Sequence, residues 1–472
     1  MATGSTLTLS SPAGPTEGDK LTFHWTTGAP DAKNWVGIYD GTRQPGTGSS
    51  LLWKYTPGAS GDVQLDTSAL TGGPYTAYLL AKDGYGILAQ SAPFTFRPKP
   101  AVLRPHAAVD ALTATAVAPG GAVTVKLGKL WSRPAGNPAG TATFRRIGGD
   151  GWLSVAADGT VTGTAPTTAP AHPAMVTVGV KDSAGATDTV TVLVPVRAAA
   201  GPLQLKTAAW NLWDAGTHVT DALEKQLRVI LTQGLDVVAL QETAGTAAQA
   251  LADALGWYAY QSSGSVGVLS RYPLTAVTPV TTALPAAGVT LQLPGGRSAR
   301  FWAAHLSEAG YGPYAVQDGQ SAAQVEAAEN ASVRLQQAKA LATAVKADIA
   351  TGVPVLLAAG LASPSHLDWT AATGRLLNWP VTVALQAAGL TDAFRAAHPD
   401  PVALPGNTWS PTRKVRGSKP EPQDRIDQVQ FAGPLTLAEA HTLATGWPQA
   451  DPATAANEWP SDTAAAVATF TL

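Results

Sequence analysis

The pattern of hydrophobic residues changes once along the chain, near residue 200, and this change restricts the possible folds. Before it, short runs rich in β-branched and aromatic residues, such as residues 21–25, 35–39 and 75–80, are separated by clusters of Gly, Pro, Asp and Ser. Such spacing is typical of β-sandwiches. After it, strand-like runs alternate with alanine-rich helical stretches, which indicates an α/β or α+β domain with a layered core.

The second half also allows particular elements to be predicted. We expect helices at residues 222–232 and, as one long helix, at residues 326–349. We expect strands at residues 237–240 and 353–357, which are short apolar runs with turn-forming residues nearby. The region from residue 203 onward is large enough to be a catalytic domain, so we expect any enzymatic function to lie in it.

Two linker-like segments divide the chain into three predicted parts. Residues 97–100 (RPKP) form a stiff boundary, because proline removes backbone donors and favours an extended chain. Residues 198–202 (AAAGP) indicate a second linker. We therefore predict a multidomain chain with all-β modules at residues 1–98 and 99–200 and a larger domain at residues 203–472.

Composition excludes several classes of protein. There are no cysteines, so disulfides, thiolate metal sites and a cysteine nucleophile are excluded. No apolar run reaches the roughly 18 residues of a membrane-spanning helix. The formal net charge is −2, and acidic residues outnumber basic ones from Leu203 onward, which argues against strong nucleic-acid binding and favours a small-molecule substrate. The first residues lack a basic segment followed by an apolar stretch, so no secretory signal is expected there.

Six short motifs occur in the C-terminal part in a fixed order: residues 209–213 (AWNLW), 238–242 (VALQE), 266–273 (VGVLSRYP), 303–306 (AAHL), 424–427 (DRID) and 459–462 (WPSD). In this order they resemble the motifs of the endonuclease/exonuclease/phosphatase superfamily. The resemblance covers essentially all of residues 203–472. It implies the DNase I-like fold, an α+β sandwich of four layers.

The two N-terminal modules carry weaker resemblances. Residues 34–39 (NWVGIY) and 82–89 (KDGYGILA) are similar to β-sandwich domains that precede phosphoesterases in secreted bacterial proteins. Residues 152–164 (WLSVAADGTVTGT) resemble immunoglobulin-like modules of cell-surface proteins. These likenesses imply a bacterial protein that is extracellular or attached to the cell surface.

The family resemblance implies a chemistry and assigns residues to it. Enzymes of this family hydrolyse phosphate esters with a divalent metal, which neutralises charge on the phosphoryl oxygens while a histidine activates water. By resemblance, Asn211, Glu242 and Asp462 belong to the metal site, since Mg²⁺ prefers oxygen ligands. His305 would contact the phosphate, and Asp427 would lie behind the general base. The candidate catalytic set is thus Glu242, His305, Asp427 and Asp462.

Three positions depart from the family pattern at the reacting centre. Gly360 and Ala362 stand where the family has the aspartate and asparagine of its Gly-Asp-x-Asn motif. Thr463 stands where the family has the histidine that serves as base, and Ser307 replaces an acidic residue found in many relatives. Each loss at such a centre typically costs ~10²–10⁴-fold in rate. Ordinary phosphodiester hydrolysis is therefore expected to be disabled, with Asn211, Gly360, Ala362 and Thr463 left to line a substrate pocket.

Ordinary structural roles compete with several of these assignments. A carboxylate at a strand end can be solvated, a strand histidine can be a satisfied core residue, and Asp427 can serve structural hydrogen bonding. A basic run of Arg413, Lys414, Arg416 and Lys419 lies among Pro and Ser residues. It fits either a solvated loop or a recognition loop for an anionic ligand.

Several functions stay open at this point. The site can be degenerate and repurposed to bind or convert a small organic substrate, including a phosphorylated one, with no cofactor required. It can be a weak Mg²⁺-dependent phosphodiesterase or phosphatase that keeps one ion on Asn211, Glu242 and Asp462. The chain can also be a non-enzymatic cell-surface binding protein, or a hydrolase that was deliberately inactivated.

Overall fold

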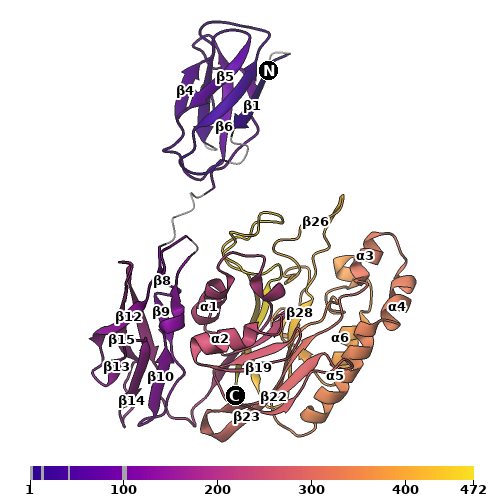
Figure 1. Ribbon diagram of the computed structural model, residues 1–472. Helices are drawn as coiled ribbons and strands as arrows, with labels where there is room; N and C mark the ends of the chain where they lie inside the picture. The colour runs from indigo at the N-terminus through magenta and orange to yellow at the C-terminus, as the bar shows by residue number, and fades with distance from the viewer. Residues whose placement is uncertain (1–3, 12–14, 41–42, 98–103, 135) are drawn as a thin grey trace. The chain divides into compact units, whose positions relative to one another are not determined.

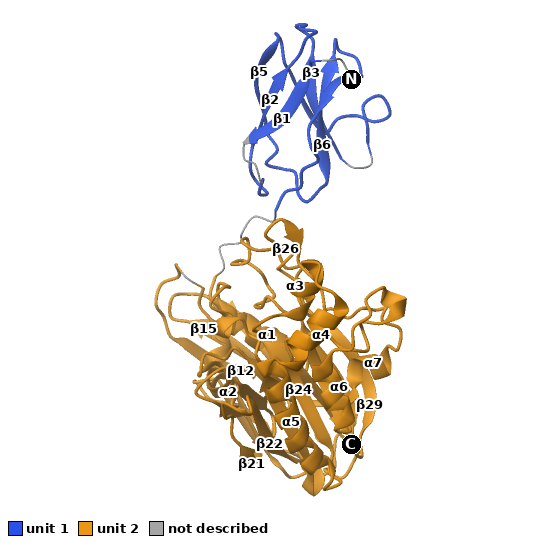
Figure 2. Cartoon of the chain, turned by 90° about the vertical axis from the view of Figure 1, so that its right-hand side faces the viewer, with its two compact units in different colours: residues 1–103 blue, residues 104–472 orange. Residues whose placement is uncertain are grey.

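The computed structural model describes residues 4–11, 15–40, 43–97, 104–134 and 136–472. Their contacts divide the chain into two compact units, residues 1–103 and residues 104–472 (Figure 2). The predicted start of the second module at residue 99 falls outside the described residues. Because the division lies at 103/104, the predicted boundary near residues 200–203 stays a prediction. Among the described residues, no helix is both long and apolar enough to cross a membrane.

Unit 1 is a sandwich of two antiparallel sheets, as the sequence predicts. One sheet has the order β1-β2-β5 and the other β4-β3-β6-β7. Their strands are β1 (Thr6–Ser11), β2 (Leu21–Thr26), β3 (Trp35–Asp40), β4 (Leu52–Tyr55), β5 (Ser60–Leu65), β6 (Tyr75–Ala81) and β7 (Gly86–Gln90). The strand β2 has alternating buried residues, so Leu21, Phe23 and Trp25 point into the core between the sheets.

The first part of unit 2 is also all-β. Its principal sheets have the orders β12-β15-β16-β9 and β10-β14-β13, and β11 pairs with β8. The elements are β8 (His106–Ala107), β9 (Ala111–Thr113), β10 (Ala122–Lys126), η1 (Gly128–Leu130), β11 (Trp131–Ser132), β12 (Ala142–Gly149), β13 (Leu153–Val155), β14 (Thr160–Thr164), β15 (Ala174–Asp182) and β16 (Thr187–Val194).

The remainder of unit 2 contains two facing sheets of six strands. The first, β19-β20-β18-β17-β30-β29, uses β17 (Gln204–Asn211), β18 (Val237–Gln241), β19 (Tyr258–Gln261), β20 (Gly267–Ser270), β29 (Thr436–Leu443) and β30 (Ala465–Thr471). The second, β21-β22-β23-β24-β28-β25, uses β21 (Leu274–Thr278), β22 (Ala286–Leu293), β23 (Arg297–His305), β24 (Val355–Gly360), β25 (Thr391–Asp392) and β28 (Asp427–Ala432).

Helices cover both outer faces of this pair of sheets (Figure 1). The helices are α1 (Ala222–Thr232), α2 (Ala247–Leu255), α3 (Gly312–Gln317), α4 (Ala322–Asn330), α5 (Val333–Ile349), α6 (Pro380–Ala387) and α7 (Ala393–Ala397), with short η2 (Asp214–Gly216), η3 (Pro294–Gly296) and η4 (Ala371–Thr373). A small hairpin pairs β26 (Val415–Arg416) with β27 (Lys419–Pro420). One core lies between the sheets, a second between the sheet of β23 and β24 and helices α5 and α6, and a third beneath α1 and α2. The result is the four-layer α+β sandwich expected for a DNase I-like fold.

The core beneath α1 and α2 continues into the β-module that precedes them. Buried residues of that module, such as Leu112 and Leu127, belong to the same hydrophobic cluster as Leu227 and Leu251 of the two helices. Polar contacts cross the same boundary, because the Arg228 guanidinium donates to the carbonyl of Ala108 at 3.0 Å. The β-module and the sandwich therefore pack as one unit.

The sequence prediction of one helix at residues 326–349 is wrong in its extent. The chain forms α4 and α5 instead, separated by Ala331 and Ser332. Ser332 has an extended backbone, and its hydroxyl accepts a hydrogen bond from the amide of Leu335, so it is the N-cap of α5. The apolar periodicity on both sides obscured this capping residue. The helix predicted at residues 222–232 is confirmed as α1.

Candidate functional site

The candidate side chains converge because of strand direction. Strands β17 and β18 are parallel and end together at Asn211 and Gln241, and β23 and β24 are parallel and end together at His305 and Gly360. The antiparallel strand β28 begins opposite Gly360, at Asp427. In the first sheet, the antiparallel strand β30 begins just after Asp462 and Thr463. Six strand termini from both sheets thus meet at one edge of the sandwich.

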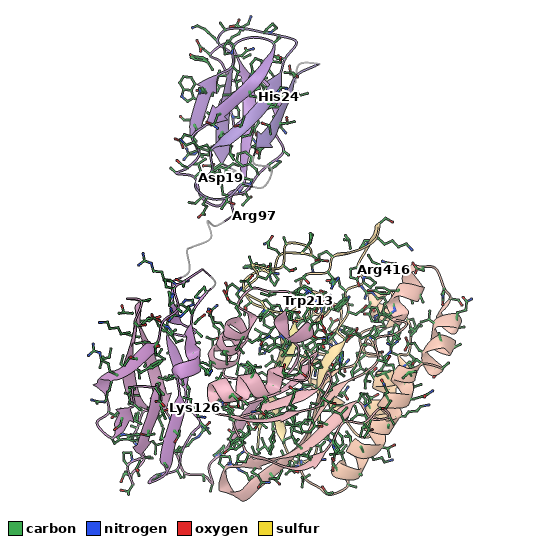
Figure 3. The ribbon with its side chains drawn as sticks, viewed as in Figure 1. Asp19, His24, Arg97, Lys126, Trp213 and Arg416 are labelled. Carbon is green, nitrogen blue, oxygen red and sulfur yellow. The ribbon has the colours of Figure 1, made fainter. Side chains whose placement is uncertain are left out.

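Glu242 and Asn211 are tied to each other at the centre of this edge. The amide of Asn211 donates from Nδ2 to Glu242 Oε1 at 2.7 Å, and the backbone amide of Asp214 donates to Glu242 Oε2 at 3.0 Å. The side-chain oxygen Oδ1 of Asn211 accepts from the backbone amide of Trp213 at 2.8 Å. Glu242 has a left-handed φ of 53°, uncommon for a side-chain-bearing residue, at the turn that follows β18. Trp213, on the segment after β17, is labelled in Figure 3.

His305 lies between a hydroxyl and a carboxylate. Its Nδ1 is 2.6 Å from Ser265 Oγ, and its Nε2 is 3.1 Å from Glu308 Oε1. Burial lowers the pKa of His305, but the hydrogen bond to Glu308 and the surrounding carboxylates outweigh burial and raise it above its usual value. Glu308, one residue after Ser307, therefore gives His305 an acidic partner. Neither Glu308 nor Ser265 was predicted from the sequence as a site residue. Only the short His-x-x-Glu spacing could have indicated Glu308.

Asp427 is a buried carboxylic acid with an unsatisfied oxygen. Its backbone amide donates to the Thr408 hydroxyl at 3.0 Å, whereas Oδ2 has no hydrogen-bond partner among the described residues. Burial raises the pKa of Asp427 from its usual 3.8 to about 7. The hydrogen bond with Thr408 and the charge of His305 oppose this shift, and the charge of Asp462 adds to it. Near neutral pH this group can therefore donate or accept a proton.

Asp462 and Thr463 play different parts. Burial and the negative charge of Glu242 raise the pKa of Asp462 to about 7, against the effect of Arg413, whose Nε donates to Asp462 Oδ2 at 3.4 Å. The Thr463 hydroxyl is 3.2 Å from Ser461 Oγ, and its carbonyl accepts from the indole of Trp459 at 2.7 Å. Thr463 thus belongs to the hydrogen-bond network that anchors the start of β30.

Two residues beside Gly360, Gln241 and Asp427, have buried polar atoms without hydrogen-bond partners among the described residues. A Cβ placed at Gly360 would lie 3.3 Å from His305 Cδ2, 3.4 Å from Asp427 Oδ1 and 3.5 Å from Gln241 Cγ. The Gln241 amide is fully buried, and neither its nitrogen nor its oxygen has a hydrogen-bond partner among the described residues. Ala362, also buried, follows with a left-handed φ of 50°. The space immediately above Gly360 is therefore narrow, and it is less roomy than the loss of a side chain suggests.

The basic run of the sequence divides between two environments. Arg413 joins the site through Asp462, and its guanidinium lies over the Trp213 ring at 5.6 Å. Arg416 and Lys419, on the β26–β27 hairpin, instead form ion pairs with Asp318 at 2.7 and 2.6 Å. Figure 3 labels Arg416 on this hairpin. Lys414 donates from Nζ to the Ser410 carbonyl and to Gln423 Oε1, so Arg413 is the member of this run that contacts the candidate acids.

Two sets of side chains could hold a divalent ion. In the all-oxygen set of Asn211, Glu242 and Asp462, the amide and both carboxylate oxygens of the first two residues already take part in hydrogen bonds. In the second set, ligand atoms of Glu242, His305 and Glu308 all lie within 4.8 Å of one another. An imidazole with two carboxylates suits Zn²⁺ or Mn²⁺ better than Mg²⁺. The second set thus brings three candidate ligand atoms together, although Glu242 and His305 also take part in hydrogen bonds there, and both ion sites stay predictions.

The C-terminal part of the chain is similar to known proteins of one family. The sequence model of the endonuclease/exonuclease/phosphatase family matches residues 208–462. An uncharacterized protein of Caenorhabditis elegans, F14F9.5, is 32% identical over 288 residues, covering 57% of this chain and 91% of the worm protein.

Solved structures are more distant. An endonuclease/exonuclease/phosphatase from Beutenbergia cavernae shares 19% identity over 57% of this chain and 72% of its own, with a TM-score of 0.37. A protein of the same family from Bacteroides thetaiotaomicron shares 12% identity over 58% of this chain and 99% of its own, with a TM-score of 0.39.

Proposed function

Because the chain belongs to the endonuclease/exonuclease/phosphatase family, we propose that its sandwich retains the family site as a pocket for a small organic ligand and lacks ordinary metal-dependent phosphodiester hydrolysis. One observation carries this proposal. Beside Gly360, the Gln241 side-chain amide and Asp427 Oδ2 are buried without hydrogen-bond partners among the described residues. An aspartate at position 360, as the family has, would extend from a Cβ that lies 3.4 Å from Asp427 Oδ1 and 3.5 Å from Gln241 Cγ.

Hydrolysis needs groups that this site does not offer in the family positions. Thr463 is an alcohol engaged with Ser461, and an alcohol cannot serve as a general base near neutral pH. Gly360 and Ala362 carry no polar side-chain atoms, so neither can ligate a metal or position a phosphate. Asp427 consequently has no base to orient, although it is buried as such a residue would be.

The charges that remain favour one kind of ligand. Glu242, Glu308, Asp427 and Asp462 outnumber His305 and Arg413 around the site. A dianionic phosphate alone would be repelled by ionised carboxylates, whereas an organic molecule with hydroxyl or amino donors would find acceptors there. A phosphorylated ligand would need an ion on Glu242, His305 and Glu308, where the ion would supply the positive charge for the phosphate oxygens.

Restoring the missing side chains tests the proposal. With bis(p-nitrophenyl) phosphate and Mg²⁺ or Mn²⁺, the unmodified protein should be no faster than its Glu242→Gln variant. The triple variant Gly360→Asp, Ala362→Asn, Thr463→His should gain at least ~10²-fold in rate. Hydrolysis by the unmodified chain that already depends on Glu242 would refute the loss of activity. No gain in the triple variant would show that the pocket differs from the family site beyond these positions.

A weak metal-dependent phosphoesterase is the second candidate, and the cluster of Glu242, His305 and Glu308 favours it. In that case, turnover of p-nitrophenyl phosphate should require Mn²⁺ or Zn²⁺ and should be lost in Glu308→Gln. Under the first proposal, p-nitrophenyl phosphate with Mn²⁺ should raise the melting temperature without release of p-nitrophenol.

An extracellular or cell-surface location stays part of the proposal, supported by the resemblances of the β-modules, and fractionation of the producing cells would test it.

A further inference from the structure

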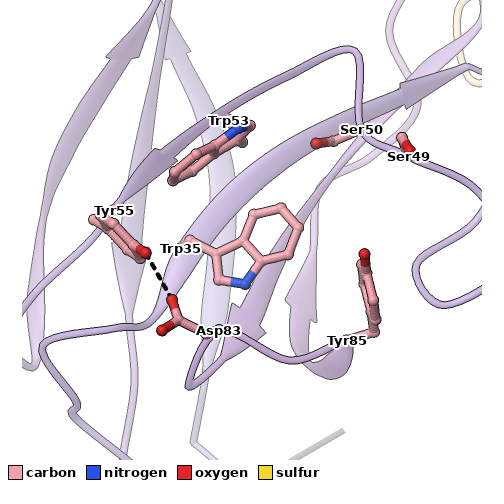
Figure 4. Close-up of a pocket in the computed structure, with 7 residues that line it drawn as sticks. All are labelled: Trp35, Ser49, Ser50, Trp53, Tyr55, Asp83 and Tyr85. Atoms are coloured by element: carbon pink, nitrogen blue, oxygen red, sulfur yellow. Dashed lines mark hydrogen bonds between the residues drawn. The ribbon is translucent and has the colours of Figure 1, made fainter.

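Unit 1 carries a cleft of about 350 Å³ that the family site does not involve. It lies on the outer face of the sheet β4-β3-β6-β7 and beside the turn that joins β6 to β7 (Figure 4). Its lining residues are Trp35, Ser49, Ser50, Trp53, Tyr55, Asp83 and Tyr85. Four of the seven are aromatic and one is acidic. We name this group of residues the aromatic cleft.

Strand register places the aromatic rings together. Trp53 and Tyr55 are two residues apart on β4 and therefore share a face of the sheet, and they pair with Gly37 and Trp35 of β3. Gly37 is required here, because a Cβ at this position would lie 2.7 Å from Trp35 Cζ3. The absence of a side chain lets the Trp35 ring lie across the strand. Trp35 consequently forms a floor that the other rings border.

The rings stand nearly at right angles to one another. Trp35 and Trp53 have centroids 6.1 Å apart and planes at 77°, and Trp35 and Tyr85 have centroids 6.1 Å apart and planes at 72°. Trp53 and Tyr55 meet at 82° with centroids 5.1 Å apart. The Trp35 ring therefore forms the floor of the cleft and the other rings form its walls, like the sides of a box. In this arrangement the electron-rich faces of several rings can contact the same ligand.

The walls of this box are exposed to solvent although they are large and apolar. The exposed fraction is 54% for Trp53, 54% for Tyr85 and 45% for Tyr55, whereas Trp35 is buried. Grouped exposed aromatic side chains of this kind mark binding sites more often than structural surface. Nothing in the sandwich core requires them, because the core of unit 1 lies on the other face of the sheet.

Asp83 adds a negative charge at the edge of the box. It accepts a hydrogen bond from the Tyr55 hydroxyl at 2.7 Å and one from Lys33 Nζ at 2.5 Å. The hydrogen bond from Lys33 lowers the pKa of Asp83, so the carboxylate is ionised at neutral pH. Lys82 and Asp83 have φ values of 53° and 55°, and this left-handed turn holds the carboxylate beside the rings.

Two polar groups of the cleft are already paired within the protein. The Trp35 indole donates to the Gly84 carbonyl at 3.1 Å. The Tyr55 hydroxyl already donates to Asp83. The ring faces and the Asp83 carboxylate, which is ionised and paired with Lys33, together attract a compact cation with little need for hydrogen bonds, and the hydroxyls of Ser49 and Ser50 also line the cleft.

We propose that the aromatic cleft binds a quaternary ammonium group, with Trp35, Trp53 and Tyr85 presenting ring faces and Asp83 supplying the counter-charge. Such a cation has no hydrogen to donate, and it is recognised by ring faces and by charge, both of which this cleft offers. The group can belong to a free small molecule or to a lipid headgroup.

Calorimetry on the full chain with choline, and with its uncharged carbon isostere 3,3-dimethylbutan-1-ol, tests the proposal. Choline should bind, and the isostere should bind at least ~10-fold more weakly, because only the charge differs. Trp53→Ala and Asp83→Asn should each weaken choline binding by ~10-fold or more. Lys33→Gln should strengthen it, because it removes the cation that competes for Asp83. Trp447→Ala is the matched control, since this indole is 93% exposed and lies in unit 2.

Flotation with vesicles distinguishes the two sources of the cation. Binding to phosphatidylcholine vesicles and not to phosphatidylglycerol vesicles would assign a lipid headgroup, whereas binding of choline alone would assign a free small molecule. Equal binding of choline and its isostere would overturn the proposal, as would absence of choline binding or binding of methyl glucoside in its place. Tyr85→Ala provides a second variant if Trp53→Ala lowers the melting temperature.

Discussion

The buried acid Asp427 should make the stability of unit 2 depend on pH, and Asp427→Asn should remove the part of this dependence that Asp427 contributes beside Asp462. The pKa of Asp427 rises from its usual 3.8 to about 7 on folding, chiefly because of burial. As pH rises, the unfolded chain therefore loses this proton first, and the folded state is progressively disfavoured between about pH 4 and pH 7. A shift of roughly 3 units corresponds to a loss of about 4 kcal/mol, which stays constant above pH 7.

Asparagine keeps the shape of the side chain and has no proton to lose. The melting temperature of Asp427→Asn should therefore exceed that of the unmodified protein at pH 7.5, and the difference should shrink as pH falls to 4.5. Scanning calorimetry of both proteins at half-unit intervals of pH measures this difference. Asp253→Asn, an exposed position on α2, is the control and should run parallel to the unmodified protein. A difference for Asp427→Asn that does not change with pH would refute the reasoning, because it would mean that the carboxyl is ionised throughout.

Three further outcomes are expected. Glu308→Gln should lower the pKa of His305, because it removes the charged hydrogen-bond partner of Nε2. NMR titration of the imidazole measures this pKa, and an unchanged value would mean that the contact is absent in solution. Arg425→Leu should destabilise unit 2 by about 3–5 kcal/mol, since it leaves the buried Asp392 without its ion pair at 2.7 Å; a melting curve that does not move would contradict this. Calorimetric titration with Mn²⁺ should give weak binding that Glu242→Gln abolishes, whereas equal binding by the variant would exclude the cluster as the site.

The family and its fold could be predicted because their signals are local. The six motifs each lie within a few residues of a strand end, and they identified the four-layer sandwich that the fold and the family match confirm. The extent of the helix at residues 326–349 could not be predicted, because Ser332 becomes a cap only when its backbone is extended. The roles predicted for the site residues stay predictions, although the side chains do gather at one edge.

Other members of the site were invisible in the sequence for a physical reason. Ser265 contacts His305 across 40 residues of chain, and Arg413 contacts Asp462 across 49. No sequence pattern distinguishes Ser265 from other serines, and the basic run that contains Arg413 does not show which of its members contacts Asp462. Their partners are chosen by loop conformation, which depends on packing between the sheets. The aromatic cleft is similar, because Asp83 meets Tyr55 only through the pairing of β3 with β4 and β6.

The sequence by itself determined the succession of β-rich and mixed regions, the approximate position of strands such as β18, and the residue types near their ends, whereas the strand expected at residues 353–357 is β24 at Val355–Gly360. These follow from hydrophobic periodicity and from turn-forming residues, which act over a few positions. Tertiary structure alone decided that Asp427 Oδ2 and the Gln241 side-chain amide are buried without hydrogen-bond partners among the described residues, and that four aromatic rings of unit 1 line one cleft. Burial and charge depend on every neighbour in space, so the pKa of Asp427 and the shape of the aromatic cleft arise only when distant strands are brought into register.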